Sequence, residues 1–336
     1  MSYEHSWDCP HQPDAFDNWQ ESDCYWFFDS KARVGGYQRI GQFPNRGTGQ
    51  VLAFAFAEGG LRFRHSHEDV AANCARDANS QRVGNHWARA LGNGVMSFGW
   101  TEDGCSADLT FSEPFYEPRS WMKHEADEAG AAEVSRSMNT GGHLEVAGRI
   151  RGHIVIGGET HEIDALAHRD RSWGRRDYKL AHQHRMVTGT IGPELSWATY
   201  IMHLANGMVA KAGFVARHGV TTDIDDIRVL TELDWDGLTV SRLRTQLLLR
   251  DGSEIEVSGP SIEGTTFETE DWLLSSHHIV SVGSTGFTVL DITNRPQKGD
   301  FMPSASDVSK VCRTAGLSPS GDYTAFQRGI NSSGAH

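Results

Sequence analysis

The sequence lacks the features that mark secreted and membrane proteins. Its five cysteines are odd in number and form no Cys-x-x-Cys pair, which argues against a disulfide framework and a zinc ribbon. The longest apolar run, residues 51–57, is seven residues long, whereas a helix that crosses a membrane needs about 20. The first residues show no basic stretch followed by an apolar one, the pattern of a secretion signal. We therefore expect a cytoplasmic protein with reduced thiols and no membrane span.

Basic residues are also scarce. Lys and Arg number 31 against 44 Asp and Glu, which gives a net charge of -13. This charge repels phosphate backbones and anionic lipids, so we expect no nucleic-acid partner. The sequence has neither a Gly-rich phosphate loop between a strand and a helix nor a Gly-x-Ser-x-Gly nucleophile turn. The Gly-Gly pairs at 35–36 and 59–60 are predicted to form turns.

Alternation of apolar and polar residues dominates the chain and predicts many short strands. Residues 52–56 and 61–67 indicate one hairpin, and residues 143–156 and 159–163, joined by Gly157-Gly158, indicate another. Helical patterns are confined to residues 67–79 and 306–314. The further predicted strands are residues 95–100, 107–111, 187–191, 197–204, 208–217, 227–233, 238–250, 254–257 and 287–292.

This pattern predicts an all-β protein. Short strands at turn-punctuated spacing, without helices of crossover length between them, are typical of antiparallel barrels. Two halves of similar strand content predict two barrels in tandem, the first formed by residues 1–180 and the second by residues 181–336.

Residues 164–177 stand apart, because they hold four arginines and three aspartates around a Trp-Gly pair. In an extended strand, alternate side chains point to opposite faces. His168 and Asp170 would then be neighbours that could exchange protons, although a solvated salt-bridge cluster would have the same composition. The first face holds Asp164, Leu166, His168, Asp170 and Ser172, and the second holds Arg169, Arg171 and Trp173.

Two stretches of this region resemble a known family. His168-Arg-Asp170-Arg-Ser-Trp173-Gly174 resembles the Asp-His-Glu-Trp-Gly or Asp-His-Ser-Trp-Gly signature of carotenoid 1,2-hydratase and AttH-like proteins. The sequence His143-Leu-Glu145-Val-Ala-Gly-Arg-Ile resembles the His-Tyr-Glu-Gln stretch that precedes that signature in bacterial relatives. The resemblance covers roughly residues 140–178 and implies two lipocalin-like barrels in tandem.

The resemblance also implies a chemistry. Proteins of this fold group include hydratases and cyclases that act on isoprenoid or polyketide-derived hydrophobic substrates. In the hydratase, a signature aspartate protonates a carbon–carbon double bond and water captures the cation. Asp170 matches that aspartate, whereas Arg171 and Ser172 replace the His-Glu pair of the hydratase.

We therefore expect an acid–base enzyme that works without cofactor or metal on a hydrophobic unsaturated, terpenoid substrate. Asp170 is the expected acid, and His168 and His143 are expected to position it or to relay protons. A homodimer is compatible with this interpretation. The residues expected to bind the substrate are Trp173, Glu145, Tyr178 and Trp197.

Two other functions fit the same sequence. Barrels of this kind commonly only bind, so the protein could be a carrier of a hydrophobic small molecule. Alternatively, His-x-His pairs at 65–67 and 182–184 could hold a metal ion. Additional ligands for such an ion would come from Glu68, His203, His277 and His278.

Overall fold

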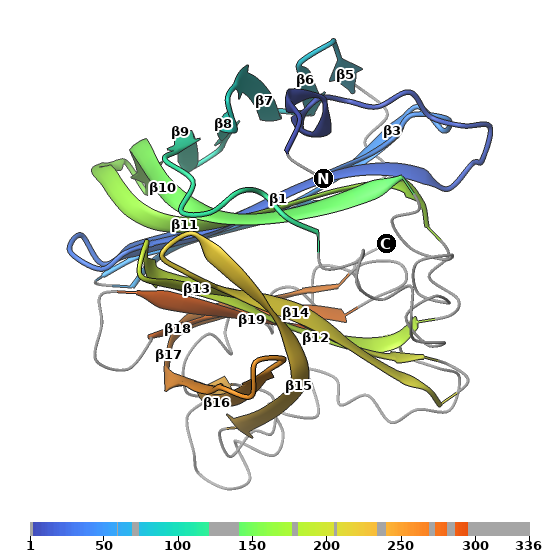
Figure 1. Cartoon of the computed structure of the whole chain (residues 1–336). Helices are drawn as coiled ribbons and strands as arrows, with labels where there is room; N and C mark the ends of the chain where they lie inside the picture. Colours follow the sequence, from blue (N-terminus) through green and yellow to red (C-terminus); the bar gives the residue numbers. More distant parts are fainter. Residues whose placement is uncertain are drawn as a thin grey trace, which may run out of the picture.

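The computed structural model describes residues 3–58, 60–68, 74–120, 141–176, 181–204, 207–233, 240–268, 273–280 and 286–294. Within these ranges the elements are nineteen strands and one short 3-10 helix, η1 (His5–Asp8) (Figure 1). No helix in the described ranges has the length and apolarity that a membrane span requires. The predicted all-β class is confirmed.

The first eleven strands form one antiparallel sheet in the order β4-β3-β2-β1-β11-β10-β9-β8-β7-β6-β5. The sheet curls on itself, so that β2 and β3 contact β6. Gln42 of β2 secures this closure by donating to the carbonyl oxygens of Ala75 and Arg82. The strands are β1 (Trp19–Asp29), β2 (Val34–Phe43), β3 (Thr48–Ala57), β4 (Leu61–His67), β5 (Ala75–Arg76), β6 (Ser80–Val83), β7 (His86–Gly92), β8 (Val95–Glu102), β9 (Cys105–Ser112), β10 (Gly142–Ile156) and β11 (Glu159–Arg175).

The remaining eight strands pair in chain order and close into a barrel. They are β12 (Ala181–Gly192), β13 (Leu195–Leu204), β14 (Val209–Arg217), β15 (Val220–Leu233), β16 (Val240–Leu249), β17 (Glu254–Glu268), β18 (Leu273–Val280) and β19 (Phe287–Asn294). Two curled antiparallel units, as predicted, therefore make up the described chain.

The helix predicted at residues 67–79 is wrong where the structure describes it. His67 is the last residue of β4, and Ala75–Arg76 form β5, which pairs with β6. The helix predicted at residues 306–314 lies outside the described residues.

The turn predicted at Gly35 and Gly36 is also wrong, because both residues lie inside β2. An added Cβ at Gly35 would lie 2.3 Å from the Cζ of Phe56, and one at Gly36 would lie 2.6 Å from the Cε1 of Phe27. The two glycines are needed because aromatic rings cross the strand here.

We expect Gly35→Ala to lower the free energy of unfolding by about 1–3 kcal/mol, the usual effect of overpacking a core. The Phe56 ring that the new methyl group would meet is buried. Urea unfolding of the variant measures this change. An unchanged midpoint would mean that Phe56 has room to move aside.

The sheet packs on the barrel along an interface that we call the seam. In Figure 1, strands β1, β10 and β11 lie between strands β5–β9 above them and the barrel below. The apolar core crosses the seam, since one buried cluster contains residues of both units, whereas a second cluster fills the barrel interior. The ring pairs across the seam are Tyr37–Phe267, Phe56–His278 and Tyr116–Phe214.

Candidate active site at the seam

Four of the predicted site residues meet on strands β10 and β11. The two strands pair antiparallel, with Glu145 opposite Asp170 and Ala147 opposite His168. Because side chains two residues apart share a face, His143 lies beside Glu145 on the same face of the sheet. The structure thus brings His143, Glu145, His168 and Asp170 together.

The His143 ring lies between the two carboxyl groups. Its Nε2 is 2.9 Å from Asp170 Oδ2 and 3.2 Å from Glu145 Oε1. Its Nδ1 is 3.5 Å from the hydroxyl oxygen of Ser120. A protonated ring can donate at both nitrogens, so this arrangement suits an imidazolium.

The His168 ring links the sheet to the barrel. Its Nε2 lies 2.5 Å from Glu145 Oε2 and 2.9 Å from Thr188 Oγ1. The Thr188 hydroxyl donates to the carbonyl oxygen of Trp197 at 2.9 Å, so its oxygen is left to accept from His168. His168 therefore carries a proton on Nε2 and donates it both within its own sheet and across the seam.

Burial and charge act in opposite directions on these groups. Burial by itself lowers the pKa of His143, but the Asp170 charge and the hydrogen bonds with both carboxylates outweigh it and raise the pKa to about 9. Burial raises the pKa of Glu145, but hydrogen bonds from His143 and His168 bring it down to about 2. For Asp170, burial and the Glu145 charge raise the pKa. At neutral pH the protonated ring of His143 thus lies between Glu145, which is ionised, and Asp170, whose raised pKa lets it take up a proton more readily.

We expect this histidine to make stability depend on pH. The folded protein holds the His143 proton up to about pH 9, whereas an imidazole in the unfolded chain releases it near 6.5. The stabilisation is therefore complete below pH 6.5, declines as the pH rises, and is lost above 9. The difference amounts to about 3 kcal/mol. Urea unfolding across this pH range measures it, and His143→Gln should remove this part of the pH dependence; a variant with the wild-type slope would contradict the assignment.

Exposure separates Asp170 from its neighbours. The side chain of Asp170 is 15 % exposed, whereas those of His143, Glu145 and His168 are at most 1 % exposed. Of these four side chains, Asp170 is thus the one that solvent contacts to any appreciable extent.

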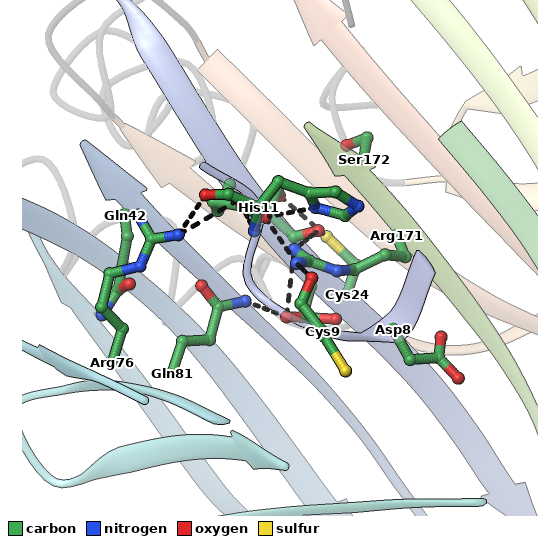
Figure 2. Close-up of polar contacts among 12 residues, drawn as sticks. Asp8, Cys9, His11, Cys24, Gln42, Arg76, Gln81, Arg171 and Ser172 are labelled. Atoms are coloured by element: carbon green, nitrogen blue, oxygen red, sulfur yellow. Dashed lines mark hydrogen bonds and ion pairs between the residues drawn. The ribbon is translucent and has the colours of Figure 1, made fainter. Parts of the chain in front are cut away.

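The arginines of the motif lie on the opposite face of β11, as the alternation predicts. Arg169 binds Asp8 through two hydrogen bonds of 2.7 and 3.0 Å. Arg171 lies 2.5 Å from Glu21 Oε2 and 3.4 Å from Asp23 Oδ2, and it also donates to the carbonyl oxygen of Cys9. Figure 2 shows the segment from Asp8 to His11 lying against Arg171. The two arginines therefore hold the N-terminal segment and neutralise acids of β1, instead of neutralising Asp170.

One protein family covers both units. A family described as a domain of unknown function (DUF7064) matches residues 4–296. The chain belongs to the DUF7064 family. No curated protein matches the sequence.

Solved structures similar to this DUF7064 protein share its fold at low sequence identity. CghA bound to Sch210972 is 12 % identical with a TM-score of 0.57, covering 84 % of this chain and 90 % of that one. A putative AttH from Nitrosomonas europaea is 9 % identical with a TM-score of 0.53, covering 85 % and 98 %. Kievitone hydratase from Nectria haematococca is 11 % identical with a TM-score of 0.53, covering 87 % and 93 %. The predicted resemblance to AttH-like proteins is thereby confirmed for the fold.

Two other predicted site residues of the DUF7064 chain do not join this cluster. The Trp173 ring stacks on His11 at 3.9 Å between ring centres, on the Arg171 face of the sheet. The Trp197 ring belongs to the cluster that fills the barrel, and only its carbonyl oxygen reaches the site, through Thr188. Tyr178 lies outside the described residues.

The histidine pairs have partners that the sequence pattern does not show. His65 and His86 both face Glu102, with Nε2 to Oε1 distances of 3.8 and 3.4 Å. Two imidazoles and a carboxylate could hold a metal ion. Here, however, Gln38 Nε2 donates to His86 Nδ1 at 2.9 Å and to the carbonyl oxygen of Gly99, which places the His86 proton on Nε2. That nitrogen therefore carries the proton and offers no lone pair to a metal, and it has no hydrogen-bond partner in the described part of the chain.

The second pair gives no metal site within the described side chains. His184 Nε2 lies 2.8 Å from the Thr293 hydroxyl oxygen, and its ring packs on Tyr200. The side chains of His182 and His277 lie outside the described part of the chain.

Sequence reasoning did not find Ser120 and Thr188. Both are small hydroxyl residues, and Thr188 belongs to the other unit. Neither residue type nor spacing distinguishes them from the many threonines and serines of exposed strand faces.

Proposed function

We propose that this protein is a hydratase-type acid–base enzyme that adds water to, or removes it from, a hydrophobic unsaturated substrate of the terpenoid class. The observation that carries this proposal is the Asp170 carboxyl group, partly exposed at the seam and hydrogen-bonded to the buried His143 imidazolium. The expected roles of Asp170, His143 and His168 are retained in it, and no cofactor is required.

The relatives support this class of reaction. One similar structure is named a hydratase, and another holds the bound compound Sch210972. Since fold alone does not determine chemistry, the proposal depends on the groups at the seam.

The proton would follow the hydrogen bonds of the cluster. Asp170 in its acid form gives its proton to one carbon of the double bond, and water bonds to the cation left on the other carbon. His143 Nε2, 2.9 Å from Asp170 Oδ2, can return a proton to Asp170. Glu145, held as a carboxylate by His143 and His168, keeps His143 protonated.

Aromatic rings on the same face would shield a cation. Trp26 pairs with His168 across β1 and β11, and its ring packs on Tyr37 at 5.3 Å. Ring faces attract positive charge, an effect that is stronger away from water. The buried seam is a suitable environment for it.

Incubation with geraniol, linalool, farnesol and squalene in ¹⁸O-labelled water tests the proposal. We expect one of these compounds to gain ¹⁸O in a new hydroxyl group, or to lose water, at a rate proportional to enzyme. Tight binding of several compounds without any conversion would overturn the proposal in favour of a carrier.

A further inference from the structure

A second buried carboxyl group faces the seam from the barrel. Asp291 is on β19, where Phe287 and Val289 share its face because side chains alternate along a strand. Those two residues belong to the cluster that crosses the seam, whereas Leu290 belongs to the barrel interior. Asp291 therefore points toward the sheet that carries Asp170.

Asp291 has no Arg or Lys partner among the described residues, and the polar side chain that lowers its pKa is the Ser276 hydroxyl. The residue is 4 % exposed, and its Oδ1 has no hydrogen-bond partner in the described part of the chain. A buried carboxylate without a counter-charge is costly, and arginines stabilise the buried acids Asp8 and Glu21 elsewhere in this protein. An acid placed on a seam-facing position among apolar residues therefore calls for a functional explanation.

Asp291 and Asp170 lie within electrostatic reach of each other. The charges of Asp170 and Glu145 raise the pKa of Asp291, although burial raises it most. Cys24, which pairs with Asp170 across β1 and β11, has its thiol pKa raised by burial and then by both aspartates. Strand β19 also contacts β1. The two carboxyl groups thus face the same part of the seam from opposite units.

We propose that Asp291 is the second catalytic carboxyl group, the base that takes the proton from the attacking water. This inference rests on the proposed hydratase function. It assigns a residue to the removal of the proton from water, a step that Asp170 does not perform. Asp170 acts from the sheet and Asp291 from the barrel, with the double bond between them.

The step balances in atoms and charge. The O–H bond of Asp170 breaks and a C–H bond forms at one alkene carbon. A water oxygen bonds to the cationic carbon, and one O–H bond of that water breaks as its proton passes to the Asp291 carboxylate. One proton has then moved from Asp170 to Asp291, and exchange with solvent returns both groups to their starting states. In dehydration, Asp291 protonates the leaving hydroxyl group and Asp170 takes the proton from carbon.

The proton affinity of Asp291 suits this role. Burial raises the pKa of Asp291 most, and the charges of Asp170 and Glu145 raise it further. The Ser276 hydroxyl lowers it, and the result is a pKa of about 7. A general base works best when its pKa is near the working pH, because it is then ionised in part and still accepts a proton strongly.

Labelled water separates the two proton transfers. The wild-type protein, Asp170→Asn and Asp291→Asn are each incubated with the four terpenoids in water that carries both ²H and ¹⁸O. We expect Asp291→Asn to lower ¹⁸O incorporation by about 100-fold or more, while deuterium still enters the recovered alkene through Asp170. Asp170→Asn should lose both labels.

Asp23→Asn is the matched control, because Asp23 is also buried and burial raises its pKa to about 7, but it lies on the Arg171 face of the sheet. It should hydrate at the wild-type rate, and Asp164→Asn on the surface provides a second control if Asp23→Asn does not fold. Wild-type hydration by Asp291→Asn, or equal loss of both labels, would overturn the role of Asp291 and leave the proposed function standing. A wild-type protein that incorporates neither label would overturn the proposed function itself.

Discussion

We expect Asp170→Asn to lower kcat for hydration by about 10²–10⁴-fold, the usual contribution of a general acid. Asparagine keeps the shape of the side chain and can still contact His143, but it has no acidic proton to give. Binding of the substrate should stay close to wild type, because the amide occupies the same space. Steady-state kinetics, together with a direct binding measurement, would check both expectations.

Asp164→Asn is the matched control for this variant. Asp164 lies on the same strand, but its side chain is 58 % exposed and pairs with Arg149 at the surface. We expect it to retain wild-type kcat. If the two variants had equal activity, Asp170 could not be the acid.

The largest effect on stability is expected from Arg171→Leu, at about 3–5 kcal/mol. Removing this arginine leaves Glu21 and Asp23 buried without their principal counter-charge, and uncompensated buried charges are strongly destabilising. The same change releases the carbonyl oxygen of Cys9, so the N-terminal segment loses a contact as well. Urea unfolding at neutral pH measures the loss.

Arg175→Leu controls for removal of an arginine from the same strand. Arg175 pairs with Asp14 at 2.6 Å, but its side chain is 52 % exposed, and surface pairs contribute about 0–1 kcal/mol. Similar losses for the two variants would show that the Arg171 cluster contributes no more than a surface ion pair does.

The strands that the sequence could predict are those with one apolar face. The β10–β11 hairpin alternates clearly and turns at Gly157 and Gly158, so its register followed from the pattern. Strand β1 was not predicted because every one of its residues is buried, which removes the alternation. The glycines of β2 resembled a turn because only the neighbouring rings, distant in sequence, explain them.

The residues of the site likewise fall into those that the sequence could place and those that it could not. Alternation along one strand was sufficient to place Asp170 and His168 on one face and Arg171 on the other. The contribution of the barrel could not be predicted, since Thr188 and Asp291 reach the site only through the packing of the two units. A lone acid on the face of β19 that turns toward the sheet was the one available signal, and its place near Asp170 follows only from the packing of the two units.

The position of β1 between β2 and β11 has a consequence for biosynthesis. Strand β2 follows β1 directly in the chain, but β11 is complete only at Arg175. As the chain leaves the ribosome, about 150 further residues must be made before one edge of β1 and the acids Asp8 and Glu21 can bind their partners. Closing so long a loop carries an entropic cost. The motif that supplies the candidate acid is therefore also the segment whose arrival completes the first sheet, so a nascent chain stopped before it would expose an open strand edge to chaperones.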